Sequence, residues 1–273
     1  MKKKTDISLV LSGEAGKGLN TIELVLIRAL KLSGFHVFSA KEVMSRVRGG
    51  NNTVEIRVGS KPVKAFVDRI DILLPLNEGA IDRLEHRLGE DTVIIGLAEN
   101  VDEKYRSAHR FIEAPFVAMA EEIGAPIYAN SVAAGVVAGI LGGSPEILGH
   151  RMRLMFEDKG EEIVAANMKA VASGHAFGKA MAEKEAFPFD LVPDDKVKND
   201  IVLSGGEAVS LGAIAGGCSF ISSYPMSPST SVLTVLARNA GRFGIVAEQA
   251  EDEISAINMA LGAWYAGARG MVT

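Results

Sequence analysis

The chain has 273 residues, of which 48% are hydrophobic, so it is long enough to form two buried cores. Its net charge of −5, without a sustained basic stripe, argues against a nucleic-acid-binding protein. Its single cysteine, Cys218, excludes a disulfide framework and an iron–sulfur cluster held by four cysteines of this chain.

The first part of the chain, residues 1–184, is predicted to form an α/β domain. Residues 7–11 indicate a strand, and a glycine-containing loop then leads into a periodic helix that ends near Leu32. Further strand patterns occur at residues 35–38, 53–58, 70–74, 92–95 and 126–128. Helical patterns between several of these strands predict a predominantly parallel sheet, and helices are expected to dominate residues 131–184.

Two loops of this domain are candidates for holding a phosphate-bearing ligand. The loop at residues 13–18 has glycines that permit positive φ and close approach to the next helix, although its spacing is that of neither a Rossmann nor a P-loop motif. The turn at residues 46–50 joins two arginines to a flexible Gly-Gly pair, which suits a phosphate or an acidic partner surface. An exposed turn before the next strand accounts for the same pattern. The candidate ligand-binding residues are Gly13, Gly16, Gly18, Arg46, Arg48, Gly49 and Gly50.

The second part of the chain, residues 201–273, is predicted to be a shorter α/β unit. Residues 185–200 contain Pro188, Pro193 and many charges, which indicates an interdomain linker. After it, the pattern is strand, helix, strand, Tyr-Pro turn, helix, strand, helix and strand, starting with residues 201–203. So short a parallel unit would leave its sheet unfinished, so we expect it to be the N-terminal part of a longer domain.

A Tyr-Pro turn and a later acid form the most specific pattern in this unit. Tyr224-Pro225-Met226-Ser227-Pro228 is followed by Glu253 in the first turn of a predicted helix over residues 249–266. Small residues farther along that helix allow a flat ring to approach closely. The acids between residues 248 and 253 are equally typical of a helix start that complements the macrodipole. Similarly, Ser227 before a proline is typical of a helix N-cap.

The segment that contains these motifs resembles the alpha subunit of the 2-oxoacid:ferredoxin oxidoreductases. The resemblance extends from Gly205-Gly206-Glu207-Ala208 through Gly216-Gly217-Cys218 to Glu253, and the family usually has Tyr-Pro-Ile-Thr-Pro at the turn. It implies a pyrimidine-type thiamine diphosphate domain, in which Glu253 is the catalytic acid against N1′ of the cofactor. The substrate-binding residues that it implies are Tyr224, Pro225, Ser227 and Ser229; Ser227 keeps the hydroxyl of the family's threonine.

Residues 1–184 resemble the gamma domain of the same family, which carries Gly-x-Gly-Gly-x-Gly and a downstream Arg-Gly-Gly turn. Arg48-Gly49-Gly50 matches the turn, whereas Glu14 and Ala15 depart from the loop, and Glu14 places a negative charge where a phosphate would lie. The gamma domain is implicated in coenzyme A handling and subunit assembly. The resemblance therefore implies a fused gamma–alpha subunit.

Such a subunit implies oxidative decarboxylation of a 2-oxoacid to an acyl-CoA and CO2, with electrons passing through iron–sulfur clusters to ferredoxin. The resemblance implies that partner subunits of a hetero-oligomer hold the clusters, and that a beta subunit holds the Mg²⁺-diphosphate site. The fused order favours 2-oxoglutarate, and the chain alone is expected to be inactive and cytoplasmic, without membrane association. Two alternatives remain: a non-catalytic nucleotide- or coenzyme A-binding module, and a decarboxylase or transketolase-type thiamine enzyme.

Overall fold

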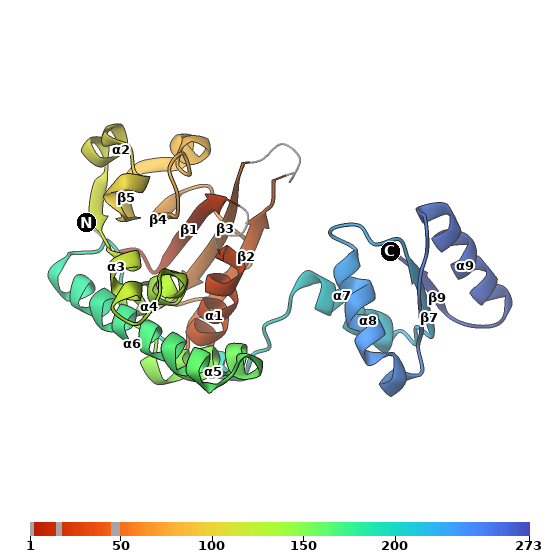
Figure 1. Cartoon of the computed structure of the whole chain (residues 1–273). Coiled ribbons are helices and arrows are strands. Elements are labelled where there is room, and N and C mark those ends of the chain that lie inside the picture. The colour runs from red at the N-terminus through yellow and green to blue at the C-terminus, as the bar shows by residue number, and fades with distance from the viewer. Residues whose placement is uncertain (1–2, 15–17, 45–49) are drawn as a thin grey trace. The chain divides into compact units, whose positions relative to one another are not determined.

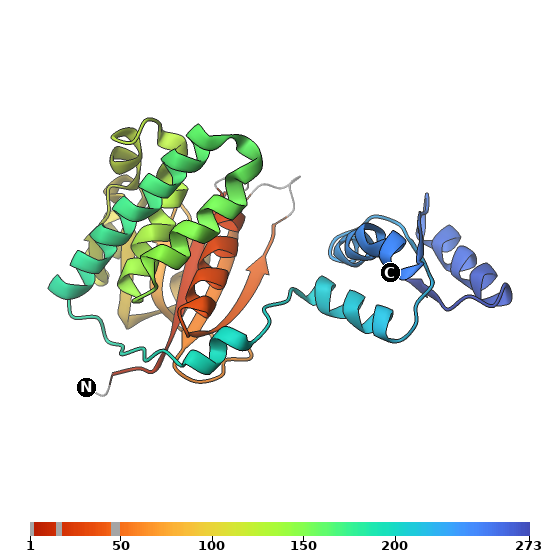
Figure 2. The same cartoon turned by 90° about the horizontal axis from the view of Figure 1, so that it is seen from below.

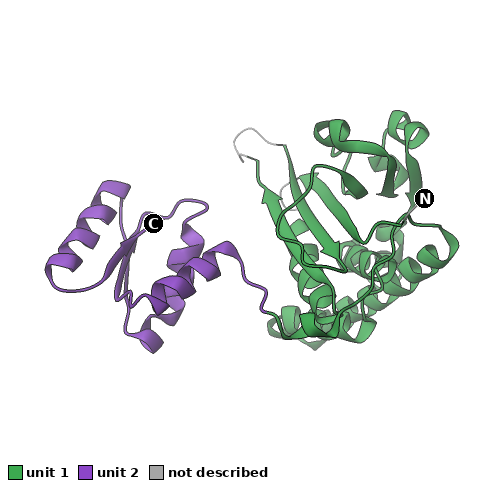
Figure 3. Cartoon of the chain, turned by 180° about the vertical axis from the view of Figure 1, so that it is seen from behind, with its two compact units in different colours: residues 1–200 green, residues 201–273 purple. Residues whose placement is uncertain are grey.

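The computed structural model describes residues 3–14, 18–44 and 50–273. The chain folds into two compact units, residues 1–200 and residues 201–273, shown in green and purple in Figure 3. Both units place helices against a sheet, so the predicted α/β fold class is confirmed. Each unit is described by itself.

The first unit is built on a six-stranded mixed sheet with the order β2-β3-β1-β4-β5-β6. The strands are β1 (Asp6–Glu14), β2 (His36–Glu42), β3 (Asn51–Gly59), β4 (Ile70–Pro75), β5 (Leu88–Gly96) and β6 (Arg110–Glu113). β1, β4, β5 and β6 pair in parallel, whereas β3 runs antiparallel to both of its neighbours. The prediction of a mainly parallel sheet holds for β1 and β4–β6. β2 ends at Glu42 and β3 begins at Asn51, so too few residues separate them for the crossover that parallel pairing needs.

Helices cover the two faces of this sheet unequally (Figures 1 and 2). The α-helices are α1 (Leu19–Leu32), α2 (Glu103–Ala108), α3 (Phe116–Glu121), α4 (Ala129–Ile140), α5 (Pro145–Phe156) and α6 (Glu161–Lys184). The short 3₁₀ helices are η1 (Asp82–Arg87), η2 (Ala98–Asn100), η3 (Pro126–Tyr128), η4 (Glu157–Lys159) and η5 (Asp195–Asn199). Ile7, Leu9 and Leu11 of β1 face the larger core, whereas Val10 faces a smaller core beneath η1 and α2. This alternation follows from the two-residue repeat of a strand, and it explains why β1 is buried continuously from Ile7 to Gly13.

α4 and α6 cross at four glycines that allow their backbones to touch. A Cβ atom on Gly135 would lie 2.3 Å from the Val171 carbonyl oxygen, and one on Gly174 would lie 2.1 Å from the Val132 carbonyl oxygen. Gly139 and Gly178 repeat this arrangement one turn along each helix. No larger residue fits at these positions without moving a backbone, so the crossing fixes the packing of the helical layer.

Residues 185–200 pack on the first unit, which corrects the prediction of an interdomain linker. Phe187 is 9% exposed and lies in the main core, and the Asp190 backbone N–H donates to the Lys4 carbonyl oxygen (2.9 Å). Farther along, the Asp194 N–H donates to the Gly34 carbonyl oxygen (2.8 Å), and Val197 is buried. The prolines and charges correctly indicated irregular backbone in this segment. The rings of Phe187 and Phe189, however, pack into and against the core of the first unit and hold the segment there.

The second unit has a three-stranded parallel sheet with the order β8-β7-β9. Its elements are α7 (Gly205–Ala215), β7 (Phe220–Ser223), α8 (Thr230–Phe243), β8 (Val246–Gln249), α9 (Glu253–Tyr265) and β9 (Gly270–Val272). Figure 1 shows α7 and α8 on one side of these strands and α9 on the other. The predicted order is found from α7 onward.

Three local predictions were wrong. Residues 126–128 form η3 instead of a strand, because Pro126 lacks a backbone donor and starts a tight turn before α4. Residues 201–203 are exposed coil and pair with no strand among the described residues. β6 was missed because its four residues are only half-buried, and its strand identity depends on pairing with β5.

Candidate functional site

The carboxyl edge of the second sheet brings together the Tyr-Pro turn and the start of α9. β7 and β8 pair in register up to Ser223 and Gln249, so the segments that follow both strands leave the sheet side by side. Tyr224 follows β7 directly, and Glu253 lies four residues after β8. Loops at the carboxyl ends of parallel strands are where open α/β sheets bind ligands.

The structure separates the roles of the acids that precede α9. Asp252 is the N-cap, and its Oδ1 accepts a hydrogen bond from the Ser255 backbone N–H (2.7 Å). Glu253 is the first helical residue, and its exposed carboxylate has no hydrogen-bond or ion-pair partner among the described residues. Asp252 therefore serves as the cap of α9, and the Glu253 carboxylate is available to contact a ligand.

The turn after β7 corrects the prediction that Ser227 caps a helix. α8 begins at Thr230, and the peptide bond between Ser227 and Pro228 is cis. Ser229 occupies the N-cap position, but its hydroxyl donates to the Met226 carbonyl oxygen (2.9 Å) and makes no cap. Ser227 is exposed, and its hydroxyl has no hydrogen-bond partner in the described part of the chain, so the fold does not use it.

Two buried serines that sequence reasoning missed hold this edge in place. Ser222 Oγ donates to the Ala256 carbonyl oxygen in α9 (2.6 Å), and Ser223 Oγ donates to the Thr273 carbonyl oxygen (2.8 Å). Both serines are 0% exposed. Two adjacent serines at the end of an apolar strand are the signal that could have identified them. Ser222 fixes α9, and hence Glu253, relative to the end of β7, and Ser223 ties that strand end to Thr273.

The glycines of the first unit lie at the end of β1 and the start of α1. Gly18 is the N-cap of α1 with φ of 76°, and a Cβ atom there would lie 2.0 Å from Asn130 Nδ2. A Cβ atom on Gly13 would lie 3.0 Å from the Leu76 side chain, and Gly50 has φ of 120°. Gly18 and Gly50 therefore suit glycine through their positive φ, and Gly13 does so through its close contact with the Leu76 side chain. The remaining candidates, Gly16, Arg46, Arg48 and Gly49, lie outside the described residues.

An asparagine pair beside Gly13 escaped the sequence prediction. Asn77 Nδ2 donates to Asn51 Oδ1 (3.1 Å), and Asn77 Oδ1 accepts from the Glu14 backbone N–H (2.8 Å). Asn51 Nδ2 donates in turn to the Gly79 carbonyl oxygen (2.9 Å). Asn77 follows the apolar strand β4 closely, which is a detectable signal for a loop-fixing residue. The pair ties the end of β1 to the loop after β4.

A cavity of about 370 Å³ lies beside the start of α1. Gly18, Asn20 and Thr21 form one wall, and the ends of β2 and β3 form the other. Lys41 lines it and forms an ion pair with the buried Glu23 of α1. The start of α1 favours a phosphate-bearing ligand at this cavity, whereas Glu14 and Glu42, which also line it, oppose one, and Lys41 is already paired with Glu23.

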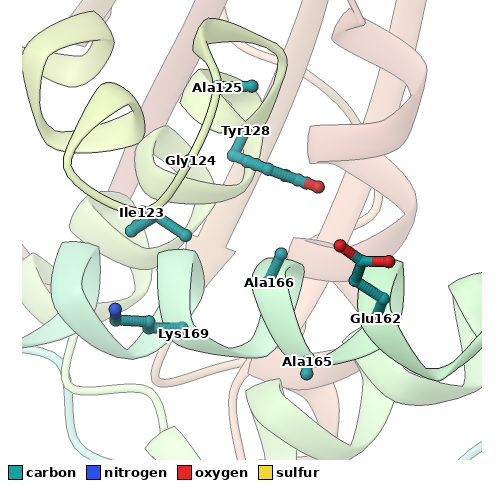
Figure 4. Close-up of a pocket in the computed structure, with 8 residues that line it drawn as sticks. All are labelled: Ile123, Gly124, Ala125, Tyr128, Glu162, Ala165, Ala166 and Lys169. Carbon is teal, nitrogen blue, oxygen red and sulfur yellow. The ribbon is translucent and has the colours of Figure 1, made fainter.

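A second cavity, of about 380 Å³, lies between the turn at residues 123–128 and α6. In Figure 4 the Tyr128 ring projects over α6, with Glu162 and Lys169 at opposite ends of the pocket. Small apolar residues make up most of its remaining wall. It shares no lining residue with the glycine loop, and its side chains offer no paired acid and base for catalysis.

A cluster of titratable side chains lies on the face of the first sheet that carries the smaller core. The Tyr105 hydroxyl donates to Glu85 Oε2 (2.7 Å), and Lys104 Nζ lies 4.3 Å from the centre of the Tyr105 ring. Partial burial and these acceptors raise the pKa of Tyr105 to about 12, although Lys104 opposes the shift. The phenol therefore stays protonated at neutral pH, and the cluster is not a general base.

Across residues 3–14, 18–44 and 50–273, the structure contains no group of three or more His, Cys, Asp or Glu side chains that could hold a metal ion. No helix in the same part of the chain is long and apolar enough to cross a membrane.

Fold and site together define a two-unit α/β protein with candidate ligand sites at the strand ends of each unit. The chain belongs to the family described as pyruvate ferredoxin/flavodoxin oxidoreductase, whose family model matches residues 8–177. A second family model, described as "Pyruvate flavodoxin/ferredoxin oxidoreductase, thiamine diP-bdg", matches residues 211–273. The resemblance recognised in the sequence is thereby confirmed.

Curated relatives match both parts of the chain. The "2-oxoacid:ferredoxin oxidoreductase subunit alpha" of Sulfolobus sp is 23% identical over 96% of this chain and 49% of its own length. The "2-oxoglutarate synthase subunit KorC" of Archaeoglobus fulgidus is 27% identical over 65% of this chain and 91% of its own length. The chain spans about half the length of the alpha-subunit relatives.

Solved structures also resemble this chain. The "2-oxoglutarate:ferredoxin oxidoreductase from Magnetococcus marinus with 2-oxoglutarate, coenzyme A and succinyl-CoA bound" has a TM-score of 0.85 and is 28% identical, covering 99% of this chain and 47% of that one. The gamma subunit of the keto/oxoacid ferredoxin oxidoreductase from Geobacter sulfurreducens has a TM-score of 0.54 at 22% identity, covering 65% of this chain and 98% of that one. At that identity it shows only that the folds are alike.

Proposed function

We propose that this chain supplies the aminopyrimidine side of the cofactor site in a thiamine diphosphate-dependent 2-oxoacid:ferredoxin oxidoreductase. The observation that carries this proposal is Glu253, an exposed acid at a helix start that the fold does not use, beside the Tyr-Pro turn of the same sheet edge. The match of residues 211–273 to a thiamine diphosphate-binding description supports it.

Thiamine diphosphate, when bound, would supply a carbon nucleophile for the 2-oxo carbon and an electron sink for the bonding pair that remains when CO2 leaves. Glu253 would hold a proton against N1′ of the pyrimidine ring, which allows the ring's amine to act as the base. The neighbouring Asp252 cannot take this role because its carboxylate caps α9. Ala256 and Ala260 are buried against the sheet, so α9 is held firmly behind the acid.

Ser227 would donate a hydrogen bond to the carboxylate of the 2-oxoacid. Its hydroxyl is exposed and has no partner among the described residues, unlike that of Ser229, which bonds within the turn. Tyr224 and Pro225, both half-buried, would shape the wall of the same site. Ser229 is proposed to act through the turn that it stabilises.

The first unit is proposed to handle coenzyme A and to contribute to subunit assembly. The cavity beside Gly18 supports this role, because helix N–H groups can bind a phosphate there. The residues that we include in this proposed site are Gly13, Gly16, Gly18, Arg46, Arg48, Gly49 and Gly50. The product would be an acyl-CoA.

Partner subunits complete the proposed enzyme. A beta subunit would hold the Mg²⁺-diphosphate end of the cofactor, and iron–sulfur clusters on partners would pass electrons to ferredoxin. The names of the KorC relative and of the Magnetococcus marinus structure favour 2-oxoglutarate as the substrate.

Hydrogen–deuterium exchange at C2 of thiamine diphosphate tests this proposal in the complex of full-length subunits. The complex with wild-type chain should exchange this proton rapidly, and Glu253→Gln should slow it while binding of the cofactor changes less. An unchanged exchange rate in the variant would contradict the assignment. An assay of ferredoxin reduction over a panel of 2-oxoacids then identifies the substrate, and decarboxylation without ferredoxin reduction would indicate another class of thiamine enzyme.

A further inference from the structure

A polar cavity of about 460 Å³ lies on the face of the first sheet opposite α1. Because side chains alternate along a strand, Thr53 and Glu55 of β3 line this cavity, whereas Val54 between them lies in the main core. Leu84 and Arg87 of η1 form part of the other wall. Small-molecule sites usually have volumes of about 300–1,000 Å³, so this cavity is large enough for a ligand.

The Thr53 hydroxyl is a buried polar group that the fold does not use. Thr53 is only 4% exposed, and its Oγ1 has no hydrogen-bond partner in the part of the chain that the structure describes. Ser12 lies directly opposite on β1, but its hydroxyl donates to the Ala80 carbonyl oxygen (2.7 Å). A buried hydroxyl without a partner is destabilising, and valine would fill the same space without this cost. The hydroxyl therefore indicates a ligand that bonds to it.

Glu55 places an acceptor beside this hydroxyl. Each of its carboxylate oxygens accepts one hydrogen bond from Arg87 (2.7 and 2.8 Å), which neutralises the charge and leaves lone pairs for a further donor. Ala40 lies opposite Glu55 on β2, and its small side chain leaves room beside the carboxylate. Two residues of a strand span about 7 Å, so one ligand can reach both Thr53 and Glu55.

The rest of the lining favours a flat, neutral ligand. Phe66 and Leu84 give the cavity an apolar side, and Phe66 is 55% exposed, so its ring can cover a planar group. Apart from His86, the charged groups of the lining balance: they are Lys41, Arg83 and Arg87 against Glu42, Glu55 and Asp68. Neither an anion nor a cation is therefore preferred.

We propose that this cavity binds the heterocyclic base of a neutral nucleoside through an exocyclic amine and the ring nitrogen beside it. The amine donates to Glu55, the ring nitrogen accepts from the Thr53 hydroxyl, and the ring lies against Phe66. Adenine and cytosine carry this pair of groups, whereas hypoxanthine and uracil have a carbonyl oxygen in place of the amine. That oxygen would face the carboxylate with no proton between them. The inference concerns the first unit only and is independent of the proposed thiamine chemistry.

Isothermal titration calorimetry of the 273-residue chain with adenosine and inosine tests this site. Adenosine should bind, and inosine should bind at least about tenfold more weakly, because it lacks the amine. Thr53→Val should weaken adenosine binding about tenfold without lowering the thermal midpoint, since the hydroxyl has no partner in the fold.

Thr92→Val is the matched control. Thr92 is 1% exposed and does not line the cavity, and its hydroxyl donates to the Ile70 carbonyl oxygen (2.7 Å). The same substitution there should lower the thermal midpoint and leave the affinity for adenosine unchanged. A further variant, Phe66→Ala, alters an exposed side chain and should weaken adenosine binding while the chain stays folded, as circular dichroism would show.

Three binding results would overturn the proposal: no binding of adenosine to the wild-type chain, equal affinity for inosine, or unchanged affinity for adenosine in Thr53→Val. A thermal midpoint that falls as far in Thr53→Val as in Thr92→Val would also overturn it, because the Thr53 hydroxyl would then have a partner in the fold.

Discussion

The two units differ in how completely each buries its apolar residues. Residues 1–200 hold 55 charged side chains, and both faces of their central sheet carry a buried core. Residues 201–273 hold only eight charged side chains but account for fifteen of the twenty-two exposed large hydrophobic residues in the described part of the chain. A sheet buried on both faces stabilises itself, whereas so apolar a surface marks a unit that works in contact with something else. The first unit therefore buries its apolar residues by itself, whereas the second leaves most of its large apolar side chains exposed in the described structure.

The largest effect that we predict comes from an exposed residue of the second unit. Glu253→Gln in the assembled enzyme should lower turnover by at least about a hundredfold, the lower end of the range for losing an acid–base group. The thermal midpoint of the chain should not change, because the Glu253 side chain makes no contact that supports the fold. Steady-state kinetics and a thermal melt check this pair of outcomes. Near-normal turnover in Glu253→Gln would show that Glu253 is not the catalytic acid and only complements the helix dipole at the start of α9.

In the first unit we instead expect a loss of stability from a substitution at a buried glycine that belongs to no candidate site. Gly174→Ala puts a Cβ atom 2.1 Å from the Val132 carbonyl oxygen and should destabilise the unit by about 1–3 kcal/mol, as overpacking does. The control is Gly149→Ala in α5, where the nearest atom lies 3.8 Å away and helix propensity should add about 0.5–1 kcal/mol of stability.

Urea denaturation can assign this effect to one unit. The single tryptophan, Trp264, lies in the second unit, whereas most of the helical residues lie in the first. Gly174→Ala should therefore shift the transition seen by circular dichroism and leave that seen by tryptophan fluorescence in place. Equal shifts of both transitions would show that the units unfold together, contrary to the comparison above.

Ser227 tests whether the Tyr-Pro turn serves the substrate or the fold. Ser227→Ala should lower kcat/KM by an amount worth about 1–3 kcal/mol, because a charged carboxylate loses a donor. Ser227→Thr keeps the hydroxyl and should be tolerated. The melting temperature should stay constant in both variants, since Ser227 is not the N-cap of α8. Loss of melting temperature alone in Ser227→Ala would exclude the substrate contact.

The smallest predicted effect concerns charge at the rim of the first sheet. Burial raises the pKa of Asp6, but hydrogen bonds from Arg57 and Arg69 outweigh it and hold that pKa below the ordinary 3.8. The carboxylate therefore stabilises the fold above the ordinary pKa, and the contribution disappears as pH falls through the lowered value. Asp6→Asn should cost less than about 1 kcal/mol at pH 7 and nothing at strongly acidic pH, measured by urea midpoints over this range. A constant difference between the two proteins at every pH would contradict the ion-pair explanation.

Much of the architecture could be predicted from local patterns. The strands β1 to β5, the helix α1 and the helical character of residues 131–184 were predicted because their apolar patterns extend over several residues or turns. The helix predicted over residues 249–266 was found as α9, but it begins four residues later, at Glu253, because Gln249 still belongs to β8. The strand at residues 201–203 was not found, because a strand needs a neighbour and these three residues have none in the described structure.

The sequence by itself determined the α/β class, the membership of the family and the position of the candidate acid, because each depends on residue types at fixed spacing. Only the tertiary structure decided which acid is occupied as a cap, that Ser227 lies outside α8, and that residues 185–200 pack on the first unit. Tertiary structure also revealed the backbone contact between α4 and α6 and the exposure of the large apolar side chains of α9. These features depend on which distant segments meet, and burial and pairing between distant segments are not encoded in the local pattern of either one.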